Sequence, residues 1–224
     1  MRPIVLTITA LLLSATAWSP AFAQNGYYYP YSHRQATGVN GRVSALTRPA
    51  IVHAIQPVRV SLPTEGRITF YAGSPDNAQV QSTPAQPGMV PGHVYRLRIS
   101  DMPEFPGVEL YPTIELLDRL HPPQGLAQEF PIPIEITEEE IEIALRDQMV
   151  TKVIYLEQPD LANPIQQVGG VLTEDVRPTA NLLQVADMKG RPMAILRIGG
   201  RIPDRHSATD EFYSRSPLFW NRGP

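Results

Sequence analysis

The sequence predicts a mainly β fold, an antiparallel β-sandwich with two short helices. Short runs of alternating apolar and polar residues recur between residues 43 and 202, turn-forming clusters separate these runs, and only two stretches have helical spacing. The 24 prolines and 15 glycines among 224 residues suit the many corners of such a domain. We expect about seven or eight strands in a single domain that spans residues 43–202.

The first 23 residues have the composition of a signal peptide. Arg2 precedes an apolar run from Ile4 to Leu13, and Ala21-Phe22-Ala23 forms a small-x-small cleavage site. We therefore expect cleavage after Ala23 and export to the periplasm or beyond the cell. No later run approaches the roughly 18 consecutive apolar residues of a spanning helix, so we expect no transmembrane anchor after cleavage.

Cysteine usage and charge exclude several classes of chemistry. The chain has no cysteine, which excludes disulfides, thiolate metal ligands and a cysteine nucleophile. It carries 19 Lys and Arg against 22 Asp and Glu, and its arginines are spread along the whole chain. Nucleic-acid binding requires a clustered basic face, so we expect no nucleic-acid partner.

The segments at both ends, residues 24–42 and 203–224, lack apolar periodicity. We expect a disordered leader and a flexible tail there. Both are rich in aromatic residues, and exposed aromatic rings beside arginine are typical of interface anchors. Two alternatives stay open: the leader is tyrosine-rich without a binding role, and the tail folds back onto the domain. The candidate partner-binding residues are Tyr27, Tyr28, Tyr29, Tyr31, Phe212, Tyr213, Phe219 and Trp220.

Five strands are expected in the first half of the domain. Two of them flank the turn 63–66, which predicts a β-hairpin. The clearest strand is the fourth, where Tyr95, Leu97 and Ile99 face one way and two arginines face the other. In the fifth strand Pro112 marks a bulge or an edge. The five expected strands are 51–62, 67–72, 78–82, 93–100 and 108–118.

The stretch 130–157 predicts a strand, a short helix and another strand. Ile132, Ile134 and Ile136 share one face of the first strand, and Pro133 suits an edge position because it cannot donate to a ladder. The β-branched run 149–157 predicts the second strand, covered on both faces over part of its length.

Between these strands, Thr137 and Glu140 have the spacing of a capping box, which predicts a helix at about 138–147. Ile141, Ile143 and Leu145 alternate, which is the competing strand signal. We favour the helix because Glu142 and Arg146 form an i, i+4 pair and the run contains good helix formers.

A second helix is predicted at about 178–188. Pro178 suits the first helical position and Gly190 the end, with apolar residues at helical spacing between them. Residues 191–198 then form the last strand, which Gly199-Gly200 ends.

Three segments carry a family resemblance: PGHVYRLRISDMPEFPGVELYPTIELLDRLHPP, FPIPIEITEEEIEIALRDQMVTKVIYLEQP and GRPMAILRIGGR. They resemble a family of exported bacterial proteins of unknown function. The resemblance covers most of residues 58–201, implies export and a common fold, and supplies no catalytic residues. The strand, helix and strand of 134–156 are also similar to the late strands of transthyretin-like folds, an analogy of fold alone.

No stretch of the sequence has a catalytic, metal-binding or cofactor-binding signature. The five histidines, His33, His53, His93, His121 and His206, lack ligand spacing. The glutamates at 138–142 lack the spaced oxygen ligands of a calcium loop. Asp204, His206 and Ser207 are the residue types of a triad, but they are adjacent in the expected tail. The arginines of strand 93–100 suit a solvated sheet face, with an acidic polymer as the alternative. We therefore expect no cofactor and no metal.

Two functional hypotheses remain. The first is a non-enzymatic, exported structural or protein-interaction module of the cell envelope, with an envelope protein or polysaccharide as its partner. The alternative is a glycan-binding protein or hydrolase whose carboxylates come together from separated loops, for example Asp101, Glu104 and Asp118.

Overall fold

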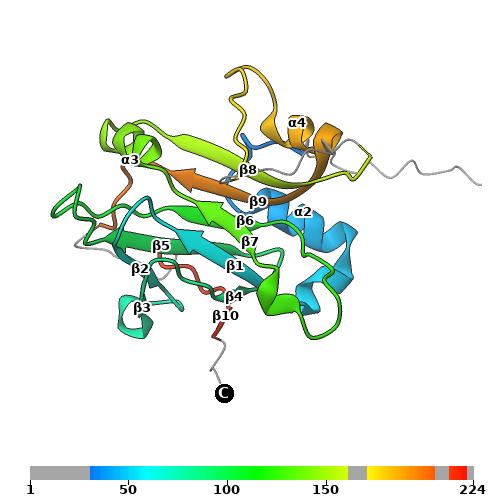
Figure 1. The fold of residues 1–224 in the computed structure, drawn as a ribbon, viewed down its shortest axis with the longest axis horizontal. Helices are drawn as coiled ribbons and strands as arrows, with labels where there is room; N and C mark the ends of the chain where they lie inside the picture. The colour runs from blue at the N-terminus through cyan, green and yellow to red at the C-terminus, as the bar shows by residue number, and fades with distance from the viewer. Residues whose placement is uncertain (1–30, 161–170, 205–211, 221–224) are drawn as a thin grey trace, which may run out of the picture. The chain divides into compact units, whose positions relative to one another are not determined.

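The computed structural model describes residues 31–160, 171–204 and 212–220. The expected signal peptide and its cleavage site, together with Tyr27, Tyr28 and Tyr29, lie outside these residues. Over the described ranges the chain is mainly β, with ten strands in two sheets and three α-helices (Figure 1). None of the helices in these ranges is long and apolar enough to cross a membrane.

Six strands form an antiparallel sheet in the order β3-β2-β5-β6-β9-β8. The alternation predicted in β5 is confirmed, since Tyr95, Leu97 and Ile99 are buried while Arg96 and Arg98 on the other face are half-buried. The strands are β2 (Arg67–Phe70), β3 (Gln79–Ser82), β5 (Val94–Ser100), β6 (Thr113–Leu116), β8 (Val150–Glu157) and β9 (Gly190–Ile198).

Four strands form the second sheet in the order β10-β4-β1-β7. β1 and β7 pair in parallel, so the expectation of wholly antiparallel pairing is wrong at this position. Pro133 in β7 lies at the edge of this sheet, as predicted, where its missing N–H group interrupts no ladder. The strands are β1 (Gln56–Ser61), β4 (Gly88–Met89), β7 (Ile132–Glu135) and β10 (Leu218–Phe219).

The predicted hairpin of 51–62 with 67–72 is wrong, because β1 and β2 belong to different sheets. Val58 and Val60 of β1 are fully buried and lie beside Ile132 and Ile134 of β7. Alternation determines which face of a strand is buried but not which strand lies next to it, so the pattern was compatible with either pairing.

The described residues include three 3-10 helices: η2 (Pro49–His53) between α2 and β1, η3 (Pro75–Asn77) and η4 (Ala127–Glu129) between strands. η2 occupies the first residues of the predicted strand 51–62, which therefore begins only at Gln56. The predicted strand 108–118 is likewise shorter, since β6 covers only Thr113–Leu116 and follows Pro112.

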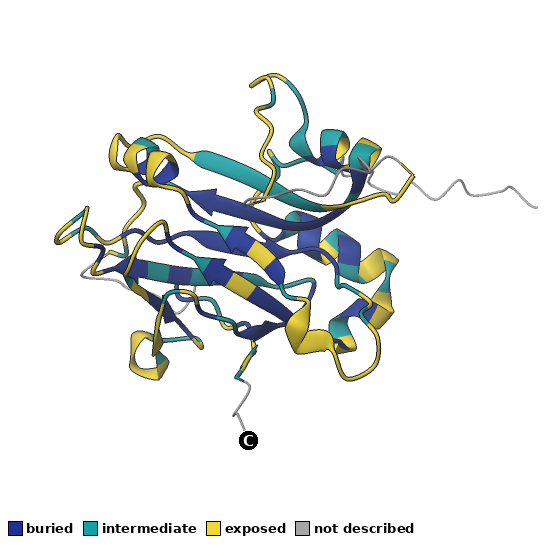
Figure 2. Cartoon of the chain, viewed as in Figure 1, coloured by how far each residue is buried: buried dark blue, intermediate teal, exposed yellow. Residues whose placement is uncertain are grey.

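Both sheets contribute to one cluster of buried side chains. It includes Val58 and Ile134 from the four-stranded sheet together with Phe70, Leu97 and Leu196 from the six-stranded sheet. Burial of each such side chain stabilises the fold by about 1.5–3 kcal/mol. Figure 2 shows the buried strands in dark blue and the exposed connections between them in yellow.

Helix α3 (Glu138–Leu145) begins at Thr137 with the predicted capping box. The Glu140 amide donates to the Thr137 hydroxyl at 3.3 Å, and the Thr137 amide donates to the Glu140 carboxylate at 3.0 Å. Ile141 and Ala144 are fully buried, as helical spacing requires. The helix prediction is thus confirmed over the competing strand, although α3 ends two residues earlier than expected.

Helix α4 (Leu182–Lys189) begins four residues later than predicted. Pro178 lies in a turn before it, and Asn181 is the N-cap, because its side chain accepts a hydrogen bond from the Leu183 amide at 3.2 Å. The helix packs on β8 and β9. Asparagine next to an apolar run was the stronger start signal than proline.

Residues 31–42 contradict the expected disordered leader. Helix α2 (Val39–Thr47) buries Asn40, Gly41 and Ser44 against the domain, while Leu46 is 80% exposed. A Cβ at position 41 would lie 3.1 Å from a backbone oxygen of Gly92, so glycine permits this close approach. The domain boundary therefore lies before residue 43, and the compact unit begins at Tyr31.

Residues 212–220 contradict the expected flexible tail and match the alternative in which the tail folds back. Phe212 and Tyr213 are buried with Tyr71 and Tyr111. Strand β10 pairs with β4, and the Ser216 hydroxyl donates to the Val94 carbonyl at 2.6 Å. These described residues belong to the folded domain.

Candidate functional site

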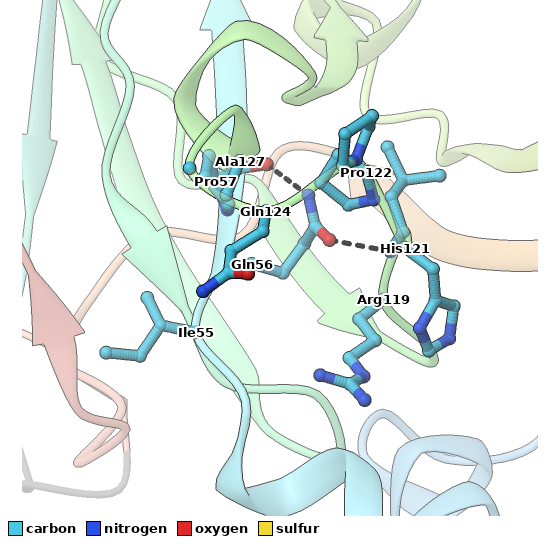
Figure 3. Close-up of a pocket in the computed structure, with 11 residues that line it drawn as sticks. Ile55, Gln56, Pro57, Arg119, His121, Pro122, Gln124 and Ala127 are labelled. Atoms are coloured by element: carbon cyan, nitrogen blue, oxygen red, sulfur yellow. Dashed lines mark hydrogen bonds between the residues drawn. The ribbon is translucent and has the colours of Figure 1, made fainter.

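A pocket of about 250 Å³ lies between the start of β1 and the loop that precedes η4. It is lined by residues 55–57 on one side and by residues 119–125 and 127 on the other. In Figure 3, Ile55 lies across the pocket from Arg119, His121 and Pro122. Two segments more than 60 residues apart in sequence therefore form one site.

Gln56 holds the two sides of the pocket together. Its side-chain oxygen accepts a hydrogen bond from the Leu120 amide at 2.7 Å, and its side-chain nitrogen donates to the Pro57 carbonyl at 2.8 Å (Figure 3). The same nitrogen lies 3.5 Å from the Phe130 carbonyl. Because Gln56 is buried and its amide is fully engaged, its role is to position the loop.

Six of the eleven lining residues are aliphatic or proline, and the lining contains no phenylalanine, tyrosine or tryptophan. The apolar lining residues are Ile55, Pro57, Leu120, Pro122, Pro123 and Ala127. Proline-rich walls keep their shape, because proline fixes the backbone angle φ. The pocket therefore combines apolar contact surface with polar side chains, Arg119, His121 and Gln124, that can orient a ligand.

Exposed apolar side chains continue this surface beyond the pocket. Ile55 and Phe219 are 49% and 43% exposed, and both lie against Gly88, where a Cβ would approach each of them closely. Leu126, at the end of the loop, and Phe130, directly after η4, are also exposed. We call Ile55, Leu126, Phe130 and Phe219 the apolar rim. The exposed loop beside buried strands is visible in Figure 2.

Arg119 is the cationic group of the pocket. Its main-chain amide donates to the Asp118 carboxylate at 2.8 Å, and its carbonyl accepts from Arg191 at 3.4 Å. Its guanidinium, in contrast, has no hydrogen-bond or ion-pair partner among the described residues, and its Nε is buried. The backbone of Arg119 is therefore held by hydrogen bonds, whereas the positive charge of its side chain has no partner among the described residues.

Asp118, directly before Arg119, is 2% exposed and holds two other arginines. Arg48 pairs with it, and the Nε of Arg191 lies 3.3 Å from the same carboxylate oxygen. Two guanidinium groups thus pair with one carboxylate, and a third arginine, Arg119, follows it directly in the sequence. The neighbourhood carries an excess of positive charge.

A second buried carboxylate, Glu115, is also fully engaged. It pairs with Arg197 at 2.9 Å and accepts the Gly41 amide at 2.7 Å. Arg197 in turn donates to the His33 carbonyl at 3.2 Å. These contacts attach the segment before α2, and α2 itself, to the outer face of β6 and β9.

The structure does not bring Asp101, Glu104 and Asp118 together. Asp101 and Glu104 follow the end of β5, whereas Asp118 follows β6, which runs antiparallel with Val94 opposite Glu115. A seven-residue strand separates the two ends by about 20 Å. Asp101 pairs with Arg67 at 3.5 Å and Glu104 accepts from Thr64. The carboxylate site expected from these three residues is therefore wrong.

Four of the five candidate partner-binding aromatic residues that the structure describes are buried or partly buried. Phe212 and Tyr213 are buried, and Tyr31 packs against a cluster formed by Leu117, Leu183 and Ile195. Trp220 meets the ring of Phe70 edge to face, with centroids 5.2 Å apart. Among the described candidates only Phe219 is substantially exposed, and its binding role stays a prediction.

The arginine face of β5 is partly covered, so it is less solvated than expected. Arg96 lies 4.1 Å over the ring of Phe212, and Arg98 pairs with Glu109 at 3.1 Å. Burial lowers the pKa of Arg96 to about 10, with Arg201 nearby as a second cause. Both side chains are therefore engaged within the protein, and Arg98 is 32% exposed.

The other singled-out residues have local roles. The His33 ring accepts the Leu182 amide at 3.1 Å at the start of α4, and Glu140 pairs with Lys152 at 2.6 Å. Burial lowers the pKa of His93. His206 and Ser207 lie outside the described residues. Within the described ranges no group of three or more histidines and acids is placed to hold a metal ion.

Comparisons with protein families, with curated proteins and with solved structures gave no match to this chain. The site therefore has to be interpreted from its geometry. Sequence reasoning missed the pocket, although the proline-rich stretch 121–125 was a local signal for a shaped loop.

Proposed function

We propose that this protein is an exported, non-enzymatic interaction module of the cell envelope and that it binds its partner through the pocket and the apolar rim. The observation that carries the proposal is the rim itself. Ile55 lines the pocket, and Leu126, Phe130 and Phe219 expose large apolar side chains in or next to the segments that form it. Groups of exposed apolar side chains typically mark interaction surfaces.

The pairing of the buried carboxylates Glu115 and Asp118 favours a binding protein over a hydrolase. Glu115 and Asp118 are each neutralised by arginine and hydrogen-bonded to backbone amides. A general acid or base needs a carboxyl group that can exchange a proton with substrate. The carboxyl group of Asp118, which directly precedes the pocket residue Arg119, is thus already used for structure.

Two further parts of the proposal concern export and the arrangement of the two sheets. The charged, apolar and small-residue segments of residues 1–23 support export. The shared core of the two sheets supports a sandwich, in which each sheet buries one face against the other.

Retention on isolated envelopes tests the proposal. Wild-type protein is expected to co-sediment with envelopes, and the double variant I55S/F219S to lose most of this retention, because it removes two apolar rim side chains. The matched control L172S/M188S removes two apolar side chains that are 73% and 64% exposed elsewhere, and it is expected to bind like wild type. Melting temperatures of all three proteins verify folding. Absence of wild-type retention, or equal retention of I55S/F219S, would contradict the proposal.

A further inference from the structure

The pocket presents one unpaired charge. Arg119 lines it, and its guanidinium has neither a hydrogen bond nor an ion pair within the described part of the chain. Its main chain is held on both sides, by Asp118 and by Arg191. A cation on a fixed backbone needs little reorganisation to receive an anion.

The surrounding charge strengthens the preference for an anion. Arg48 and Arg191 share the single carboxylate of Asp118, so Asp118 cannot also neutralise Arg119. The described chain shows no other acid paired with these three arginines. Guanidinium groups bind carboxylates through two parallel hydrogen bonds, which gives both strength and orientation.

The remaining lining distinguishes the kind of anion. Sugar recognition favours tryptophan, tyrosine and phenylalanine rings that stack on the sugar face, and the pocket lining contains none of these three residue types. Aliphatic and prolyl side chains, namely Ile55, Pro122 and Pro123, instead suit the apolar side chains of a peptide. Gln124, exposed beside them, offers an amide that can pair with a peptide backbone.

We propose that this pocket binds an acidic peptide segment of the partner: Arg119 takes an aspartate, glutamate or terminal carboxylate, and the adjoining apolar residues lie against Ile55 and the proline wall. The inference rests on the proposed function and specifies the chemistry of its partner. It requires the apolar rim and Arg119 to act on the same ligand.

Selection from a random heptapeptide library displayed on phage tests this inference with a defined probe. On immobilised wild-type protein we expect enrichment of peptides with Asp or Glu next to apolar residues or proline. The enriched peptide, synthesised and labelled, is expected to bind R119Q about tenfold or more weakly, which is the effect of losing a hydrogen-bonded ion pair. Replacement of its acidic residue by the matching amide is expected to weaken binding to wild type equally.

The control R146Q removes the same charge from an exposed arginine that pairs with Glu142 on α3, and its affinity is expected to equal that of wild type. Enrichment of neutral or basic peptides, no enrichment at all, or equal binding by R119Q would overturn the inference. Binding of alginate in place of any acidic peptide would assign an anionic glycan instead. Loss of envelope retention by I55S/F219S together with full retention by R119Q would reject the acidic peptide but leave the interaction module standing.

Discussion

Glu115 and Arg197 form a buried ion pair between neighbouring strands, and the free carboxylate oxygen of Glu115 holds the Gly41 amide of α2. The pair lies on the face of the six-stranded sheet that points away from the main core. It therefore makes the N-terminal segment part of the domain, which no apolar pattern in that segment indicated.

Substitution E115Q is expected to destabilise the protein by about 3 kcal/mol, because it leaves the charge of Arg197 buried without compensation. Urea unfolding measures this free energy. The control E142Q breaks the exposed pair with Arg146 and should change it by no more than about 0.5 kcal/mol. Equal, small effects of both variants would mean that the pair does not hold α2.

Thr137 caps α3, and T137A is expected to lower the free energy of unfolding by about 1 kcal/mol. T137S keeps the hydroxyl and should recover most of this loss. Thermal and urea unfolding of the three proteins would settle the point, and an unchanged stability of T137A would show that the capping box contributes nothing.

Tyr213 lies buried against Tyr71, with ring centroids 4.6 Å apart, so Y213A is expected to cost about 3 kcal/mol. M188A, at a side chain that is 64% exposed, is the control and should cost less than about 0.5 kcal/mol. If Y213A melted at the wild-type temperature, the C-terminal segment would be separable from the domain.

Burial raises the pKa of Tyr95, whose hydroxyl accepts the Val90 amide at 2.7 Å and donates to the Pro217 carbonyl at 3.0 Å. Y95F is expected to cost about 1–2 kcal/mol at neutral pH. Because the folded pKa exceeds the unfolded value of about 10, the contribution of the hydroxyl is complete below pH 10 and declines as the pH rises above it.

Unfolding curves between pH 8 and pH 11 measure this linkage. The stability of wild type should fall more steeply above pH 10 than that of Y95F. Other tyrosines titrate in both proteins, so the difference between the two profiles reports Tyr95. Parallel pH profiles would contradict a buried, protonated Tyr95.

The sequence predicted those elements that have a local signal, either alternating apolar residues in a strand or a capping motif at a helix start. Tyr95, Leu97 and Ile99 alternate, and Thr137 with Glu140 specifies a helix start, so β5 and α3 lie where they were expected. Helix α2 was missed because its buried face consists of Asn40, Gly41 and Ser44, while its apolar Leu46 faces solvent. A polar face has no hydrophobic period to detect.

The candidate site was missed because it depends on contacts that are distant in sequence. Residues 55–57 approach residues 119–127 only through the packing of β1 and the engagement of Leu120 by Gln56. Aromatic content also led to Phe212 and Tyr213 being predicted as partner-binding residues, whereas they are buried in the domain. Composition alone does not distinguish a buried aromatic residue from an exposed one.

The absence of cysteine from the chain permits the most direct test of the proposed interaction surface. A single cysteine introduced by Q124C beside the pocket, and labelled with a photoactivatable benzophenone, is expected to cross-link one discrete envelope component upon illumination. The control Q81C carries the same label on β3, an exposed edge strand of the other sheet, and should give no such product. A discrete product at position 124 that disappears in the I55S/F219S background is the result that the account predicts. No product at position 124, or the same product at both positions, would contradict it.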